Sequence, residues 1–141
     1  FKNKGGFMSF TIAPELARDS YHLADWPLCE VRVMDDGQFP WFLLVPKVAD
    51  VREVIDLSED DQLQLLRESR FLCHWLKAEY QPDKLNVAAL GNVVPQLHVH
   101  HIARFQTDVA WPAPIWGKQP MQPLNDGEVA RLQSVFADIT F

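Results

Sequence analysis

The feature that most restricts the fold is a pair of apolar segments separated by turn-forming residues. LCEVRVM at residues 28–34 alternates apolar and polar side chains, which predicts a half-buried strand. WFLLV at residues 41–45 is continuously apolar and is stopped by Pro46, which predicts a central strand. DDGQFP at residues 35–40 is typical of a turn. The three segments together predict an antiparallel hairpin within a sheet.

Helical spacing and strand-like runs predict the other elements. They are a short helix over residues 13–23, a long helix from an N-cap at Ser58 to about Glu79, strands at 84–90 and 97–105, and a last helix that begins at Asn125 or Asp126. The proline-rich segment 110–123 should be extended and irregular, because proline cannot donate to a ladder. This order predicts an α+β fold, with an antiparallel sheet, a long helix packed on it and a C-terminal helix.

A chain of 141 residues with 48% hydrophobic residues fits one globular domain, which we place at residues 8–141. The segment FKNKGGF at residues 1–7 resembles an artificial leader, so we expect Met8 to be the native start. The net charge of −6 argues against binding to extended nucleic acid, which requires a basic face.

The two cysteines and the apolar runs bear on the compartment. Cys29 and Cys73 are far apart and lie in apolar stretches, so we expect free thiols in a reducing, cytoplasmic environment. No apolar run approaches the roughly 20 residues of a membrane span, so no membrane partner is expected.

The segment QLHVHH at residues 96–101 concentrates three of the five histidines on one predicted strand. Alternation places one set of side chains toward solvent, namely Gln96, His98 and His100. Leu97 and Val99 then face the core beneath the long helix, and His101 lies on the same face or at the point where that face meets solvent. Three interpretations of the outward row remain open: a solvated strand face, a zinc site that would still need further ligands, and a histidine that acts as nucleophile or acid–base group.

The segment GNVVPQLHVHHIAR at residues 91–104 resembles the signature of the histidine triad (HIT) superfamily of nucleotide hydrolases and transferases, in which three histidines alternate with apolar residues. Residues 33–47 look like the nucleotide-binding hairpin of that family, and the resemblance extends over about residues 14–105. The loop glycine of the family precedes the first triad position by five residues, and Gly91 precedes Gln96 by five. This register aligns the triad with Gln96, His98 and His100.

The resemblance implies a HIT-like fold and chemistry at the α-phosphate of a nucleotide conjugate, of the nucleoside phosphoramidate or dinucleoside polyphosphate type. His98 would be the nucleophile and would form a covalent nucleotidyl-histidine, while His100 would donate to a phosphate oxygen or to the leaving-group side. Gln96 replaces the first histidine and can hydrogen bond but cannot carry a proton charge. A non-catalytic nucleotide-binding module that lost activity with that histidine is the alternative.

Several other residues have both a functional and a structural interpretation. Asn92 would donate to the α-phosphate or simply form a turn, and Asp35 would bind the ribose hydroxyls or belong to the hairpin turn. Either phosphate binding or an ordinary strand-end charge explains Arg104 and Lys47.

Trp111 and Trp116 would stack on a base or leaving group, or pack within the protein. We expect no metal and no cofactor. The expected partners are a small-molecule nucleotide conjugate and, as the resemblance implies, a second copy of the chain in a homodimer.

Overall fold

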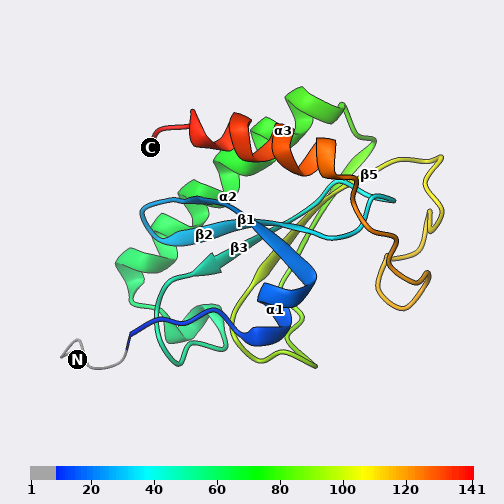
Figure 1. Ribbon diagram of the computed structural model, residues 1–141. Helices are drawn as coiled ribbons and strands as arrows, with labels where there is room; N and C mark the ends of the chain where they lie inside the picture. The colour runs from blue at the N-terminus through cyan, green and yellow to red at the C-terminus, as the bar shows by residue number, and fades with distance from the viewer. Residues whose placement is uncertain (1–8) are drawn as a thin grey trace.

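The computed structural model describes residues 9–141, which form an α+β fold (Figure 1). Its elements are α1 (Pro14–Asp19), β1 (Ser20–Asp25), β2 (Cys29–Met34), β3 (Trp41–Pro46), a short 3₁₀ helix η1 (Val54–Asp56), α2 (Glu59–Tyr80), β4 (Lys84–Ala88), β5 (Val99–Arg104) and α3 (Asp126–Ala137). The interpretation of residues 1–7 as a leader and of Met8 as the start concerns positions outside the described residues.

The strands form one antiparallel sheet in the order β1-β2-β3-β5-β4. The predicted hairpin is confirmed, because β2 pairs with β3 and Val31 lies opposite Leu44. On its other side β3 pairs with β5, where Leu43 lies opposite His100. The histidine strand therefore lies inside the sheet, between β3 and β4.

The predicted helix over residues 13–23 is only half correct. Helix α1 ends at Asp19, and the chain continues as strand β1 from Ser20. Tyr21 lies opposite Val33 of β2, and Leu23 is buried in the core. Pairing with β2 and burial of Leu23 outweigh the helical spacing of this segment, because tertiary contacts override weak local propensity.

The longer helices begin where the sequence predicts. The Ser58 hydroxyl accepts a hydrogen bond from the Asp61 amide at 3.1 Å, and the Asn125 side chain accepts one from the Glu128 amide at 2.8 Å. Helix α2 ends at Tyr80, and its C-cap Gln81 has the left-handed φ of 52° that commonly closes a helix. No helix within residues 9–141 is both long and apolar enough to cross a membrane.

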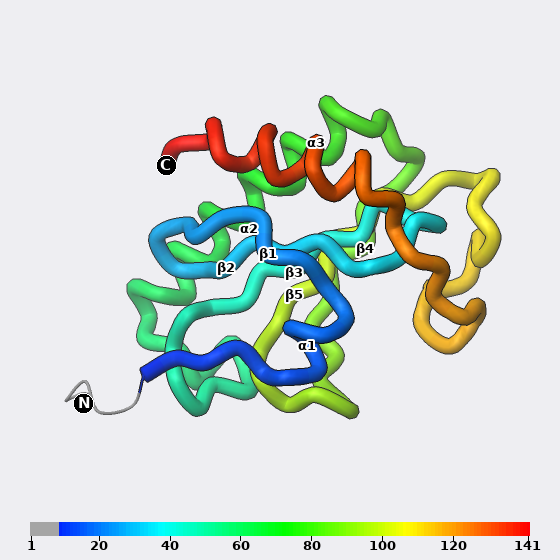
Figure 2. The backbone as a smooth tube through the Cα atoms, in the orientation of Figure 1, coloured from blue at the N-terminus to red at the C-terminus, as the bar shows by residue number. Residues whose placement is uncertain are grey.

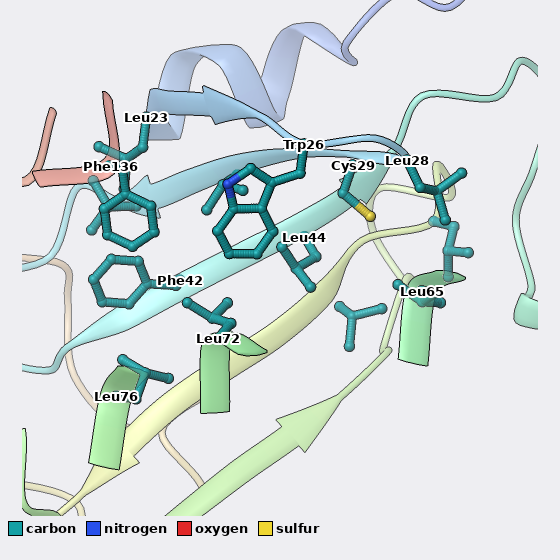
Figure 3. Packing of buried hydrophobic residues seen from close by; sticks show 14 of the residues in the cluster. Leu23, Trp26, Leu28, Cys29, Phe42, Leu44, Leu65, Leu72, Leu76 and Phe136 are labelled. Atoms are coloured by element: carbon teal, nitrogen blue, oxygen red, sulfur yellow. The ribbon is translucent and has the colours of Figure 1, made fainter. Parts of the chain in front are cut away.

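Helices α2 and α3 cover one face of the sheet and enclose the main core (Figures 1 and 3). Phe42 of β3 and Phe136 of α3 stack with ring centroids 5.9 Å apart, and Leu72 of α2 is fully buried beside them. Cys29 is buried and Cys73 is half-buried, and both are free thiols as predicted. Leu97 and Val99, which alternate with the histidines, pack into this same core.

The opposite face is also covered, which corrects the prediction that β2 is half-buried. A second apolar cluster fills this side; its buried members are Leu16, Met34, Phe39, Trp41, Leu43, Val45, Ile102, Ala110 and Ile115. Helix α1 lies here, on the side of the sheet away from α2 (Figure 1). Figure 2 shows the chain between β5 and α3 extending from one end of the sheet as an irregular segment, as its prolines predict.

Candidate active site

The histidines divide between the two faces of the sheet as alternation predicts, but the predicted exposure of the outward row is wrong. His98 and His100 are 6% and 5% exposed, because α1 and the second cluster cover their face. Both rings line a pocket of about 420 Å³. The other lining residues are Glu15, Leu16, Arg18, Asp19, Met34, Trp41, Leu90, Gly91, Asn92, Val93, Val94 and Trp116.

The orientation of the His98 ring is set by the backbone of the segment just before β5, so the predicted strand at 97–105 begins two residues later than expected. Its Nδ1 lies 2.7 Å from the carbonyl oxygen of Gln96. A carbonyl only accepts, so Nδ1–H is the donor and the neutral ring carries its lone pair on Nε2. The backbone thus selects the tautomer in which Nε2 is available as a nucleophile.

The His100 ring has the opposite tautomer. The indole Nε1–H of Trp41 donates to Nδ1 of His100 at 2.9 Å. Indole only donates, so Nδ1 is the acceptor and the proton of the neutral ring is on Nε2. Burial, together with the neighbouring His98 and His101, lowers the pKa of His100 to about 3. His100 is therefore neutral at physiological pH and presents an N–H donor.

The two rings stand next to each other with centroids 5.0 Å apart. One neutral imidazole offers a lone pair and the other offers a hydrogen-bond donor, and a different partner fixes each state. A nucleophile beside an N–H donor is an arrangement suited to attack on a centre whose oxygens gain negative charge.

His101 has no part in this pair. It is fully buried on the α2 side, where Nδ1 donates to the carbonyl of Val99 at 3.0 Å and Nε2 accepts from the Ser69 hydroxyl at 2.7 Å. Burial lowers its pKa to about 4, although the bond to Val99 acts in the opposite direction. It is a neutral structural histidine, as the alternation predicts.

The Gln96 side chain is turned toward the N-terminal segment. Its Oε1 accepts a hydrogen bond from the Ala13 amide at 2.8 Å, and its Nε2 donates to the Thr11 carbonyl at 2.8 Å. Gln96 is not among the residues that line the 420 Å³ pocket. The structure therefore brings His98 and His100 together. The side chain of Gln96, at the first aligned position, points toward the N-terminal segment instead.

The loop before the strand supplies one wall of the pocket. Asn92 lines it, and its side chain makes no hydrogen bond within residues 9–141. Gly91 has a left-handed φ of 72°, which favours glycine over other residues. Asn92 is therefore an exposed residue of the same pocket wall as Gly91.

The other charged candidates lie outside the pocket. Asp35 accepts a hydrogen bond from the Leu124 amide at 2.9 Å, so a ribose-binding role gains no support from the geometry. Lys47 lies 3.7 Å from Asp25. Arg104 is buried and pairs with Asp108, which makes it a structural residue instead of a phosphate ligand or an exposed strand-end charge. The partners of Asp35 and Lys47 come from distant segments, whereas Asp108 lies only four residues after Arg104.

Of the two candidate tryptophans, the structure places only Trp116 at the pocket, with its ring 5.1 Å from that of His100. Trp111 packs against the Arg104 guanidinium at 5.7 Å. Sequence reasoning missed Trp41, which read only as part of an apolar strand. Only the pairing of β3 with β5 brings Trp41 next to His100, and no local sequence pattern specifies that pairing.

The pocket rim carries an ion pair. The Arg18 guanidinium lies 2.8 Å from the Asp19 carboxylate, and their hydrogen bond lowers the pKa of Asp19.

Within the described part of the chain, no three His, Cys, Asp or Glu side chains gather as a metal site would require.

Comparisons with known proteins agree with this geometry. The family that matches is the HIT domain, over residues 17–107. Among solved structures, a histidine triad protein from Bradyrhizobium japonicum is 43% identical, with a TM-score of 0.88 over 92% of this chain and 96% of that chain. One from Marinobacter aquaeolei is 44% identical, with a TM-score of 0.87 over 89% and 92%.

A third, from Sinorhizobium meliloti, is 38% identical, with a TM-score of 0.89 over 94% of this chain and 98% of that chain. No curated protein matches the chain. The matched family and these structures share the α+β fold and the region that holds His98 and His100. The chain therefore belongs to the histidine triad (HIT) superfamily of nucleotide hydrolases and transferases.

Proposed function

We propose that this protein hydrolyses or transfers the nucleotidyl group of a nucleotide conjugate, through attack of His98 on the α-phosphorus. The observation that carries the proposal is the pair of opposite tautomers, with the lone pair on His98 Nε2 and the proton on His100 Nε2. Membership of the HIT superfamily supports a nucleotide as the ligand.

In the first step His98 Nε2 forms a bond to phosphorus, and the bond from phosphorus to the leaving group breaks. The bonding electrons depart with the leaving group, and a nucleotidyl-histidine remains. The Gln96 carbonyl that accepts from Nδ1–H stabilises the positive charge that the ring acquires on attack. Water or another acceptor then attacks phosphorus, which releases the nucleotide and restores the neutral ring.

His100 contributes a hydrogen bond instead of a proton in this scheme. Trp41 occupies its Nδ1, and burial keeps its pKa at about 3, so loss of the Nε2 proton would leave an anionic ring. The Nε2–H therefore stabilises negative charge on a phosphate oxygen. Leaving groups that depart as anions, such as the phosphates of dinucleoside polyphosphates, should react faster than amines, which must gain a proton.

The pocket offers both polar and apolar contacts to a nucleotide. Asn92 would donate to the α-phosphate from the loop that lines the pocket. Leu16, Met34 and Trp116 would contact a base or an organic leaving group. No cofactor enters this scheme. The free thiols of the chain favour a reducing compartment, which for this protein we take to be the cytoplasm.

A homodimer that forms through the β4 edge of the sheet is part of the proposal. β4 is an edge strand, and Val87 on it is 48% exposed. Val87 lies opposite His101, whose side chain contacts α2, and on that helix Leu66 is 65% exposed. A second copy would cover this apolar surface and pair the edge. Light scattering should give twice the chain mass, and Leu66→Glu should give monomer.

Turnover assays with diadenosine polyphosphates and adenosine phosphoramidate test the reaction. The wild-type chain should release nucleotide, and His98→Ala should release none above background. Nucleotide binding without any turnover beyond that variant would instead identify a non-catalytic binding module.

A further inference from the structure

Gln96 makes two hydrogen bonds from one planar amide to the backbone of a segment that is distant in sequence. It accepts from the Ala13 N–H and donates to the Thr11 carbonyl, both at 2.8 Å. These two groups flank Ile12, so the amide offers the donor and acceptor that a residue on an adjacent strand would offer. The side chain therefore attaches the N-terminal segment to the start of the histidine strand.

Helix α1, which follows this segment, lacks local support at its first turn. It has only six residues, and its N-cap, Ala13, provides no side-chain hydrogen bond. A helix this short is marginal without tertiary contacts, and alanine is a poor N-cap. The other end is held separately, because the Asp35 amide donates to the Asp19 carbonyl at 2.9 Å. Gln96 holds the end whose N-cap residue makes no side-chain hydrogen bond within residues 9–141.

Helix α1 forms part of the wall of the 420 Å³ pocket. Glu15, Leu16, Arg18 and Asp19 all line it. Leu16 is buried in the second cluster, against which Ile12 also packs. Any shift of the segment that Gln96 holds would move this wall relative to the histidines.

The geometry points to Gln96 as a positioning residue, which fixes the α1 wall of the pocket relative to His98. The backbone carbonyl of the same residue accepts from His98 Nδ1, so one residue orients the nucleophile with its main chain and the pocket wall with its side chain. This inference rests on the proposed function, because it assigns the wall to substrate binding.

The chemistry of the side chain explains why glutamine suits this position. The N–H and C=O of a carboxamide point in nearly the same direction, so they can bond two groups of one extended segment. The two nitrogens of an imidazole point in divergent directions and could bond only one of them. A carboxylate has no donor for the Thr11 carbonyl.

Two substitutions test whether the two hydrogen bonds of the Gln96 side chain position the α1 wall. Gln96→Met removes both hydrogen bonds at similar volume, and Gln96→Glu retains the acceptor for Ala13 but loses the donor. Gln133→Met, on an exposed turn of α3, is the matched control. The readouts are amide exchange at Ala13 by NMR, with the Asp35 amide as the internal reference, and the Kd for AMP together with kcat and KM.

Loss of both bonds should speed exchange at Ala13 by roughly tenfold or more, while Asp35 is unchanged. KM and the Kd for AMP should rise roughly tenfold, while kcat changes less than about threefold, as expected for lost binding rather than lost chemistry. Gln96→Glu should be intermediate, and Gln133→Met should match wild type.

Unchanged exchange at Ala13 in Gln96→Met would overturn the inference. So would a kcat about 100-fold lower at unchanged KM, which would place Gln96 at the reacting atoms. Faster exchange at Ala13 with an unchanged Kd for AMP would also overturn it, because the wall would then not serve binding. A wild-type protein that neither binds AMP nor turns over substrate would refute the proposed function and the binding role of the α1 wall. The exchange data would still show whether the Gln96 side chain holds the N-terminal segment.

Discussion

The hydrogen bond from Trp41 to His100 allows a sharp test of how the site is organised. Trp41→Phe retains an aromatic ring but removes the Nε1–H that donates to His100 Nδ1 at 2.9 Å. Both residues are buried, so Nδ1 is left without a partner. An orphaned buried acceptor costs about 1–3 kcal/mol of folding free energy.

The same change should affect catalysis through the tautomer of His100. If the bond contributes about 1 kcal/mol to holding the proton on Nε2 and the two tautomers are otherwise equal in free energy, its loss lowers the Nε2–H fraction from roughly five-sixths to about half. The value of kcat should then fall about twofold, because only the Nε2–H tautomer donates to the phosphate oxygen. Nitrogen NMR of the His100 ring should report Nε2–H in the wild-type protein and a mixture of tautomers in Trp41→Phe. KM should change little, because the donor acts on developing charge.

Trp26→Phe is the matched control. Trp26 is buried in the main core and does not line the pocket, and its Nε1 is buried with no hydrogen-bond partner within residues 9–141. This variant should retain both the tautomer and kcat. Equal losses in the two variants, or a wild-type Nε2–H tautomer and wild-type kcat in Trp41→Phe, would refute the role assigned to Trp41.

Two further predictions concern stability. Arg104→Met removes the charge that pairs with the Asp108 carboxylate, which keeps hydrogen bonds from three backbone amides, and should cost about 3 kcal/mol in urea denaturation. Arg131→Met removes exposed ion pairs and should cost less than about 1 kcal/mol. Equal costs would contradict the structural role of Arg104. Folding lowers the pKa of His100 from 6.5 to about 3 and that of His101 from 6.5 to about 4. Between these values the unfolded chain binds more protons than the folded chain. The stability that is fully present above pH 6.5 is therefore lost as the pH falls toward the folded-state values. At pH 5 the loss is about 2 kcal/mol for each ring, and His101→Gln should remove about half of this pH dependence.

The sequence predicted those parts of the fold that local patterns determine. The α2 boundaries follow from the Ser58 cap and the stop before Pro82, and the hairpin follows from two apolar runs and a turn. The faces of the histidine strand follow from alternation alone, which correctly separated His101 from His98 and His100.

What the sequence did not predict depends on contacts between distant segments. Strand β1 was missed because its identity comes from pairing with β2. Trp41 lies 59 positions before the histidine that it orients, and Ala13 lies 83 positions before Gln96. The burial of His98 and His100 likewise results from a second cluster that covers a face expected to be open. No spacing rule along the chain specifies these contacts.

The most direct test is to trap the covalent intermediate. The protein is mixed with a nucleotide conjugate labelled at the α-phosphate, denatured within the first turnovers and analysed by peptide mass spectrometry. We expect an acid-labile nucleotidyl adduct on His98, and no adduct in His98→Ala. An adduct on another residue, or efficient turnover by His98→Ala, would contradict the assignment of His98 Nε2 as the nucleophile.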